Sequence, residues 1–226
     1  MKAPHLFVVV ALVIASTHVV SGFQRAASGG TPDLLSVRID DLELEAVNIH
    51  VLLEELSDQK NIPIGLEVSS YDNLSQPKPI RLRIQHGTVA DALNSIVKQN
   101  PLYSWKIQDD VVNVFPVEGS RDPVLLQVLE TKLEKFSIPR GTTRFTVRQT
   151  LSTMPAITTL LNQYNVVPEI QSFMSRDFRP LGRGYELEAS NISVCALLNK
   201  IVRESQTKYW IAVRNGDKKQ YFVLNL

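Results

Sequence analysis

Apolar residues recur along residues 36–117 with two different spacings, which predict strands and helices in alternation. Apolar and charged positions alternate at Leu42–Leu44, as they do in a half-buried strand. Asn48, a residue type favoured at helix N-caps, then precedes four apolar residues at helical spacing, Ile49, Leu52, Leu53 and Leu56. Period-two alternation over 62–68 predicts a second strand. These elements make one strand–helix–strand unit.

A second unit is predicted after the polar loop at 69–79. Residues 80–84 alternate between apolar and polar, and Thr88 is expected to cap a helix whose apolar face runs over 89–97. Alternation resumes at 103–107, and Asp109-Asp110 is expected to turn the chain into a return strand. The second unit is therefore strand–helix–strand–strand.

Residues 124–226 are predicted to form a second module beyond a boundary at 116–123. We expect a strand within 128–138, a helical stretch from about Thr146 that Pro155 restarts, and a strand beginning at Val166-Val167. The fold class predicted for the chain is α+β, with tandem βαβ–βαββ modules and helices packed on short sheets.

An internal repeat supports two modules. A shift of 105 positions places residues 80–105 on 185–210 without gaps. Apolar matches are expected between any two amphipathic helices. The shared helix cap (Thr88 and Ser193), the shared Leu-Asn pair and the shared tryptophan (Trp105 and Trp210) are not demanded by that pattern. We interpret them as a duplicated module whose second copy has diverged upstream.

Two late strands, 208–213 and 221–226, are apolar on both alternating faces. A strand of this kind must be covered on both sides. We expect the chain itself to provide the cover, the alternatives being a second subunit or a partner.

The N-terminus has the pattern of an export signal. Leu6–Ala15 is an unbroken apolar run that follows Lys2. It is shorter than the roughly 20 residues that a membrane-spanning helix needs. We predict a signal peptide over 1–22 that is cleaved near Gly22, and then a flexible lead-in over 23–35. The protein is thus expected to be exported, as a periplasmic or secreted protein. An uncleaved anchor is the alternative.

Charge argues against nucleic acid as a partner. Lys2 is the only charged residue of the predicted signal peptide, so cleavage lowers the 24 Lys and Arg to 23, equal to the 23 Asp and Glu. A neutral chain without basic clusters lacks the field that nucleic-acid binding requires. No later apolar run is long enough for a transmembrane segment in the mature chain.

Catalytic and cofactor chemistry is weakly represented. Cys195 is the only cysteine, so it has no internal disulfide partner, and it reads as a small buried hydrophobe. His50 and His86, the two histidines of the mature chain, have no companion at metal-ligand spacing. We predict neither enzymatic activity nor a cofactor. A hydrolase with an unrecognised site is the alternative.

Candidate binding residues lie in the irregular loop at 171–184. It combines aromatic and arginine residues, a composition typical of protein–protein hot spots: Phe173, Arg176, Phe178, Arg179 and Arg183. An ordinary loop is the other interpretation. Exposed strand edges are a second candidate surface. Trp105 and Trp210 would instead serve as stacking surfaces in a small-ligand or glycan binder.

Residues 42–116 resemble the short N-terminal domain shared by secretins and TonB-dependent receptors. The resemblance is carried by the order of units and by the Gly87-Thr88 turn before Ala92-Leu93-Asn94-Ser95-Ile96-Val97. It implies a periplasmic, non-catalytic domain that docks other proteins of the bacterial envelope. No plug, barrel or pore follows in this sequence. We therefore expect an adaptor that binds an envelope protein, alone or as an oligomer.

Overall fold

The computed structural model describes residues 34–69, 79–169, 178–216 and 220–226, all of which belong to one compact unit. The predicted signal peptide (1–22) lies outside the described residues. So does the predicted lead-in (23–35), apart from its last two residues, Leu34 and Leu35, which begin a short 3-10 helix.

The elements of the first half follow the predicted order. They are η1 (Leu34–Ser36), β1 (Arg38–Ala46), α1 (Ile49–Lys60), β2 (Ile64–Glu67), β3 (Ile80–Thr88), α2 (Val89–Gln99), β4 (Tyr103–Gln108) and β5 (Val111–Pro116). Both predicted caps are present: the Asn48 side chain accepts a hydrogen bond from Val51 N at 3.0 Å, and Thr88 forms a capping box with Asp91. Asp109 and Asp110 both have positive φ, as a type I′ hairpin turn requires.

The second half begins with a helix that the sequence analysis missed. Its elements are α3 (Pro123–Glu130), β6 (Lys132–Ile138), α4 (Arg144–Thr153), α5 (Pro155–Gln163), β7 (Val166–Glu169), β8 (Leu187–Ser193), α6 (Val194–Glu204), β9 (Tyr209–Asn215) and β10 (Gln220–Asn225). Asp122 caps α3 by accepting bonds from the backbone of Val124 and Leu125, and Pro123 occupies the first turn. The predicted boundary at 116–123 therefore overlaps the start of α3.

Strand pairing repeats between the halves. β1 pairs with β3 as β6 pairs with β8, antiparallel in both cases. β2 lies parallel to β5 as β7 lies parallel to β10, and the hairpin β4–β5 corresponds to β9–β10. The pair α4–α5 stands where the first half has α1. The predicted α+β class is therefore confirmed, and the two halves share the same order of strand pairings, which is the order that a duplicated module would give.

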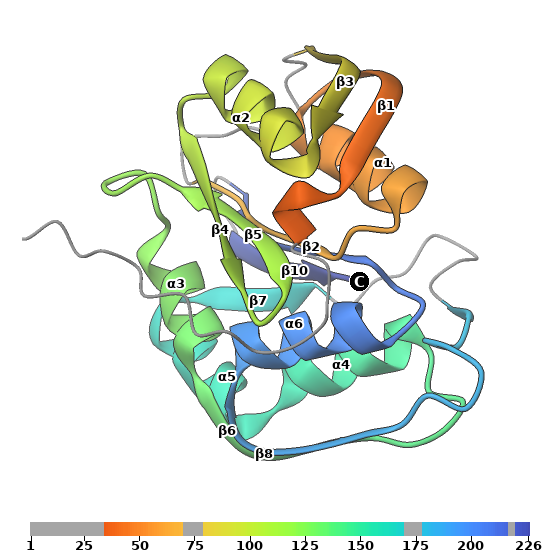
Figure 1. Cartoon of the computed structure of the whole chain (residues 1–226). Helices are drawn as coiled ribbons and strands as arrows, with labels where there is room; N and C mark the ends of the chain where they lie inside the picture. Colours follow the sequence, from red (N-terminus) through yellow and green to blue (C-terminus); the bar gives the residue numbers. More distant parts are fainter. Residues whose placement is uncertain (1–33, 70–78, 170–177, 217–219) are drawn as a thin grey trace, which may run out of the picture. The chain divides into compact units, whose positions relative to one another are not determined.

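The two halves share one mixed sheet. Its order is β4-β5-β2-β9-β10-β7, and the parallel pair β2–β9 joins the halves. Helices of the first half lie on one side of this sheet and α4 and α6 lie on the other (Figure 1). Residues of β9 alternate between two cores: Tyr209 and Ile211 pack with the first half, Trp210 and Ala212 with the second. The chain itself thus covers this two-sided strand, as predicted.

An asparagine–tryptophan hydrogen bond occurs in both copies of the repeat. The indole Nε1 of Trp105 donates to Asn94 Oδ1 at 3.2 Å, and that of Trp210 donates to Asn199 Oδ1 at 2.9 Å. Each bond ties a helix to the strand that follows it. This hydrogen bond is a physical reason why the asparagine and the tryptophan match between the two copies, which hydrophobic periodicity alone did not require.

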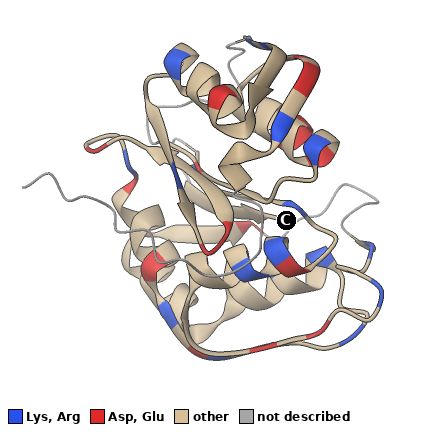
Figure 2. Ribbon diagram, viewed as in Figure 1, with Lys and Arg blue, Asp and Glu red and all other residues tan. Residues whose placement is uncertain are grey.

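Charged side chains of both signs are distributed over the elements of both halves (Figure 2). Among the described residues, no helix combines the length and apolar character needed to cross a membrane.

Candidate functional site

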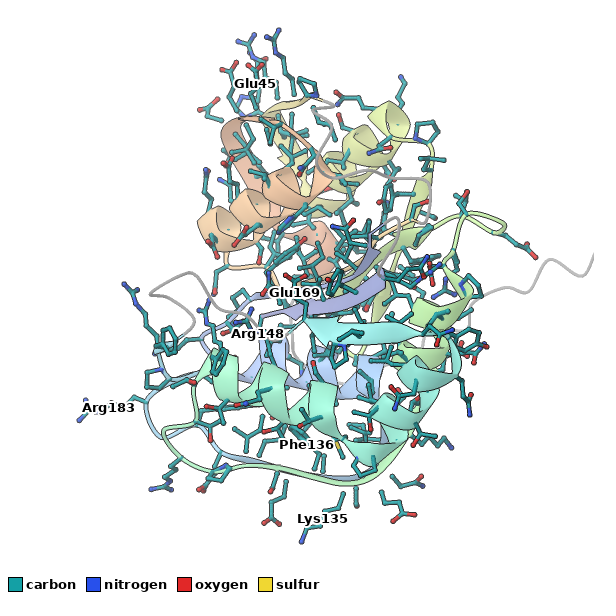
Figure 3. The ribbon with its side chains drawn as sticks, turned by 180° about the vertical axis from the view of Figure 1, so that it is seen from behind. Glu45, Lys135, Phe136, Arg148, Glu169 and Arg183 are labelled. Atoms are coloured by element: carbon teal, nitrogen blue, oxygen red, sulfur yellow. The ribbon has the colours of Figure 1, made fainter. Side chains whose placement is uncertain are left out.

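The predicted aromatic–arginine loop is described only in part. Phe173 and Arg176 lie outside the described residues. Phe178 is 58 % exposed, and its ring lies 5.5 Å from that of Phe145 in α4. Arg179 is exposed, and Arg183 is an exposed side chain that projects away from the ribbon (Figure 3). The described members thus offer one exposed ring and two exposed arginines.

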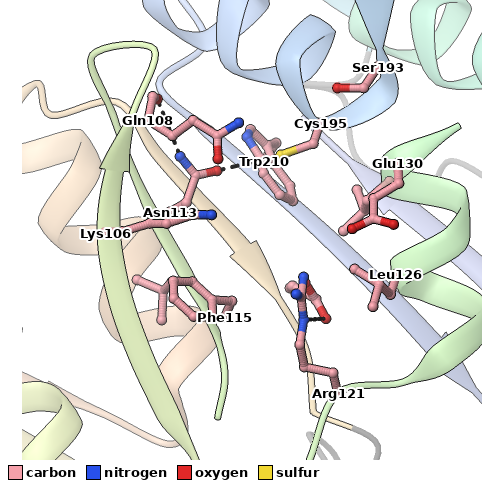
Figure 4. Close-up of a pocket in the computed structure, with 13 residues that line it drawn as sticks. Lys106, Gln108, Asn113, Phe115, Arg121, Leu126, Glu130, Ser193, Cys195 and Trp210 are labelled. Atoms are coloured by element: carbon pink, nitrogen blue, oxygen red, sulfur yellow. Dashed lines mark hydrogen bonds and ion pairs between the residues drawn. The ribbon is translucent and has the colours of Figure 1, made fainter. Parts of the chain in front are cut away.

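A cavity of about 210 Å³ opens between the hairpin β4–β5, the helix α3 and the start of α6. Its walls combine cationic, amide, thiol and aromatic groups (Figure 4), among them Lys106, Asn113, Phe115, Arg121, Cys195 and Trp210. The lining residues lie far apart in the sequence, so no local motif predicts this cavity. Ligand pockets for molecules of drug size usually measure about 300–1,000 Å³. This one accommodates a smaller group.

The ion pair of Glu67 and Arg121 forms one end of the cavity. The Glu67 side chain at the end of β2 is only 3 % exposed, and it accepts hydrogen bonds from both Nε, at 2.9 Å, and Nη2 of Arg121. The bond to Glu67 raises the pKa of Arg121, while partial burial opposes the rise. Arg121 thus contacts both carboxylate oxygens of Glu67 in a bidentate, charge-assisted pair, a geometry that fixes the position of both side chains.

The thiol of Cys195 faces the same cavity. Burial raises its pKa to about 11, with Lys106 acting in the opposite direction. At neutral pH the side chain is therefore a protonated thiol, which is a poor nucleophile. Its Sγ lies 3.8 Å from Asn113 Oδ1 as a weak donor. The cavity thus contains no activated nucleophile at Cys195.

His50 and His86 both lie outside the cavity lining. His50 in α1 stacks on Tyr209, with ring centroids 5.6 Å apart, and His86 lies in β3, where its Nδ1 is 3.3 Å from Asp40 Oδ1. His86 is therefore a strand residue. Within the described ranges, no three His, Cys, Asp or Glu side chains gather as a metal site would require.

The outer edge of β4 is a second candidate surface. Val117 N donates to Leu102 O, so by the alternation of an antiparallel ladder the even residues of β4 bond to β5. The N–H and C=O groups of Trp105 and Ile107 then point away from β5. β4 ends the six-stranded sheet, and in the described part of the chain no strand pairs with this edge.

The corresponding edge in the second half is occupied. Lys208 O accepts from Ile64 N, and Ala212 O accepts from Val68 N, so the even residues of β9 face β2. The repeat places Trp105 on Trp210, and the same shift of 105 positions, continued by two residues, places Ile107 on Ala212. The outward groups of β4 thus match the groups with which β9 receives a parallel strand.

Sequence reasoning identified β4 as a strand and named exposed edges as binding surfaces in general. It could not say which edge is open, because strand order depends on contacts between residues distant in the chain. A comparison with family models, curated proteins and solved structures found no match. The resemblance of residues 42–116 to secretin and TonB-receptor domains therefore stays a prediction.

Proposed function

We propose that this chain is an exported, non-catalytic adaptor of a bacterial cell envelope, linked to a secretin or TonB-type system. It binds a partner protein by adding a strand of the partner to the outer edge of β4. The observation that carries the proposal is the row of outward N–H and C=O groups at Trp105 and Ile107.

Strand addition suits this edge for physical reasons. Backbone groups of an edge strand are a ready template for pairing with another chain, and proteins normally blunt long edges with proline, charge or a covering element. The described β4 has six residues without proline, and of these only Lys106 is charged. Trp105 and Ile107, whose backbone groups point outward, have partly buried apolar side chains that pack on the core of the first half. A partner strand would extend that core.

Export and envelope association are supported by the sequence. The apolar run Leu6–Ala15 has the length of a signal-peptide core, and the family that residues 42–116 resemble works in the periplasm. The test is cell fractionation with mass determination of the mature chain. We expect a periplasmic protein that begins near Phe23, and retention of the precursor in the cytoplasm when Val9→Asp interrupts the apolar run. A cytoplasmic wild-type protein with an intact leader would refute export.

The binding surface is tested by a pair of variants at one position. Ile107→Pro removes the outward N–H without removing a donor to β5, whereas Ile107→Ala truncates the same side chain and keeps the N–H. After gentle cross-linking in an envelope extract, we expect wild type and Ile107→Ala to retain one stoichiometric partner and Ile107→Pro to lose it. Circular dichroism shows whether both variants are folded. A partner retained equally by both variants would place the binding surface elsewhere.

A further inference from the structure

We infer that the strand received by β4 runs parallel to it and carries a glycine opposite Trp105. This inference rests on the proposed function and adds the chemistry of the partner. Its template is the junction of β2 and β9 within the same sheet.

In that junction a glycine meets a tryptophan. Gly65 of β2 is the cross-strand partner of Trp210, and the indole lies directly over the glycine. A Cβ at position 65 would come within 2.1 Å of Trp210 Cε2 and 2.4 Å of Nε1, whereas real Cβ contacts are essentially never below 3.0 Å. The tryptophan of β9 therefore admits only glycine on the adjacent strand.

Trp105 is held as Trp210 is held. Each indole donates from Nε1 to the asparagine eleven residues earlier, on the helix that precedes the strand. Trp105 also packs against the first core, as Trp210 packs within the second. Because helix, hydrogen bond and strand correspond, the ring of Trp105 is directed over the position that a neighbouring parallel strand would occupy.

The difference between the halves is what fills that position. Trp210 is 2 % exposed because β2 lies beside it, while Trp105 is partly exposed at the sheet edge. A strand with any larger residue opposite Trp105 would have to displace a ring that Asn94 anchors. A strand with glycine there would bury the ring without moving it. The partner class is thus an extended segment with glycine between strand-forming residues.

The probe is a synthetic peptide with the sequence of residues 60–69 of this chain, which contains Gly65 in its natural strand context. Its matched control carries valine in place of that glycine. Binding to the full chain is followed by the two indole N–H signals in nuclear magnetic resonance spectra and by calorimetry. We expect the Trp105 signal to shift. We also expect the glycine peptide to bind at least about fivefold more tightly than the valine peptide, because displacing a packed ring costs at least as much as that factor.

Trp105→Ala separates recognition by the indole ring from nonspecific peptide binding. Without the indole, the preference for glycine over valine should fall below about threefold, because the obstruction is gone. Equal binding of both peptides to the wild type, or no binding of either, would overturn the inference. The partner test with Ile107→Pro is independent of both results and still decides the proposed function. A dimer of the peptide-free chain that Ile107→Pro dissociates would assign the edge to a second copy and likewise overturn the inference.

Discussion

Gly65→Ala should destabilise this protein severely, although it adds only one methyl group. The new Cβ would come within 2.1–2.4 Å of three indole atoms of Trp210. The ring cannot yield cheaply, because it is 2 % exposed and bonded to the fully buried Asn199. Forced overpacking costs about 1–3 kcal/mol, and disturbing a hydrogen bond to a buried amide costs about 1–3 kcal/mol. We expect a loss of about 2–6 kcal/mol in the free energy of unfolding.

The assay is thermal and urea unfolding followed by circular dichroism. For a protein of this size, 1 kcal/mol corresponds to about 2–4 °C in Tm, so the midpoint should fall by roughly 4–24 °C. Gly182→Ala is the matched control. A Cβ at position 182 would have its nearest contacts at 3.5 Å, with Gln206 and Tyr185, which is ordinary van der Waals contact. It should leave Tm nearly unchanged.

A double-mutant cycle tests the cause. In a Trp210→Phe background the indole is absent, so the cost of Gly65→Ala should shrink by at least about 1 kcal/mol. An unchanged cost in that background would show that the glycine is needed for another reason. An unchanged Tm for Gly65→Ala in the wild type would refute the packing argument altogether, and with it the template for strand recognition at β4.

Three further predictions concern the cavity and the helix caps. Cys195 should react with iodoacetamide far more slowly than a free thiol at pH 7.5. Burial raises the pKa of this thiol from the ordinary value of 9.0 to about 11. The stability that the buried neutral thiol contributes should therefore be present below pH 9 and lost as the pH rises from 9 to about 11. Alkylation rates and unfolding free energies measured against pH would show this loss. Arg121→Met should lower the free energy of unfolding in urea by about 3 kcal/mol, the low end of the range for a broken buried ion pair, because Arg121 is 34 % exposed. Adding Glu67→Gln should recover part of this loss, and no recovery would contradict the pairing. Ser193→Ala should lower stability by about 1 kcal/mol through loss of the cap on α6, while Ser190→Ala, in the exposed part of β8, should have no measurable effect.

Periodicity alone located most elements because each strand and helix must present an apolar face to a core. The spacing at 49–56 and 89–97 found α1 and α2, and Asn48, Thr88 and Ser193 marked helix starts because their side chains accept backbone hydrogen bonds locally. It missed α3 because that short helix is buried along much of its length, and a continuous apolar run does not distinguish helix from strand. The loop chosen for its aromatic and arginine content was found by composition, which says nothing of where its side chains lie.

The sequence by itself determined the repeat, the order of the units and the need to cover β9 on both faces. These features depend on neighbours along the chain and on the chemistry of single residues. Only the tertiary structure decided that β2 of the first half pairs with β9 of the second. That pairing leaves β4 at a sheet edge and sets Gly65 beneath Trp210. The reason is physical: strand order is fixed by hydrogen bonds and packing between residues more than a hundred positions apart, and no local pattern encodes such a distance.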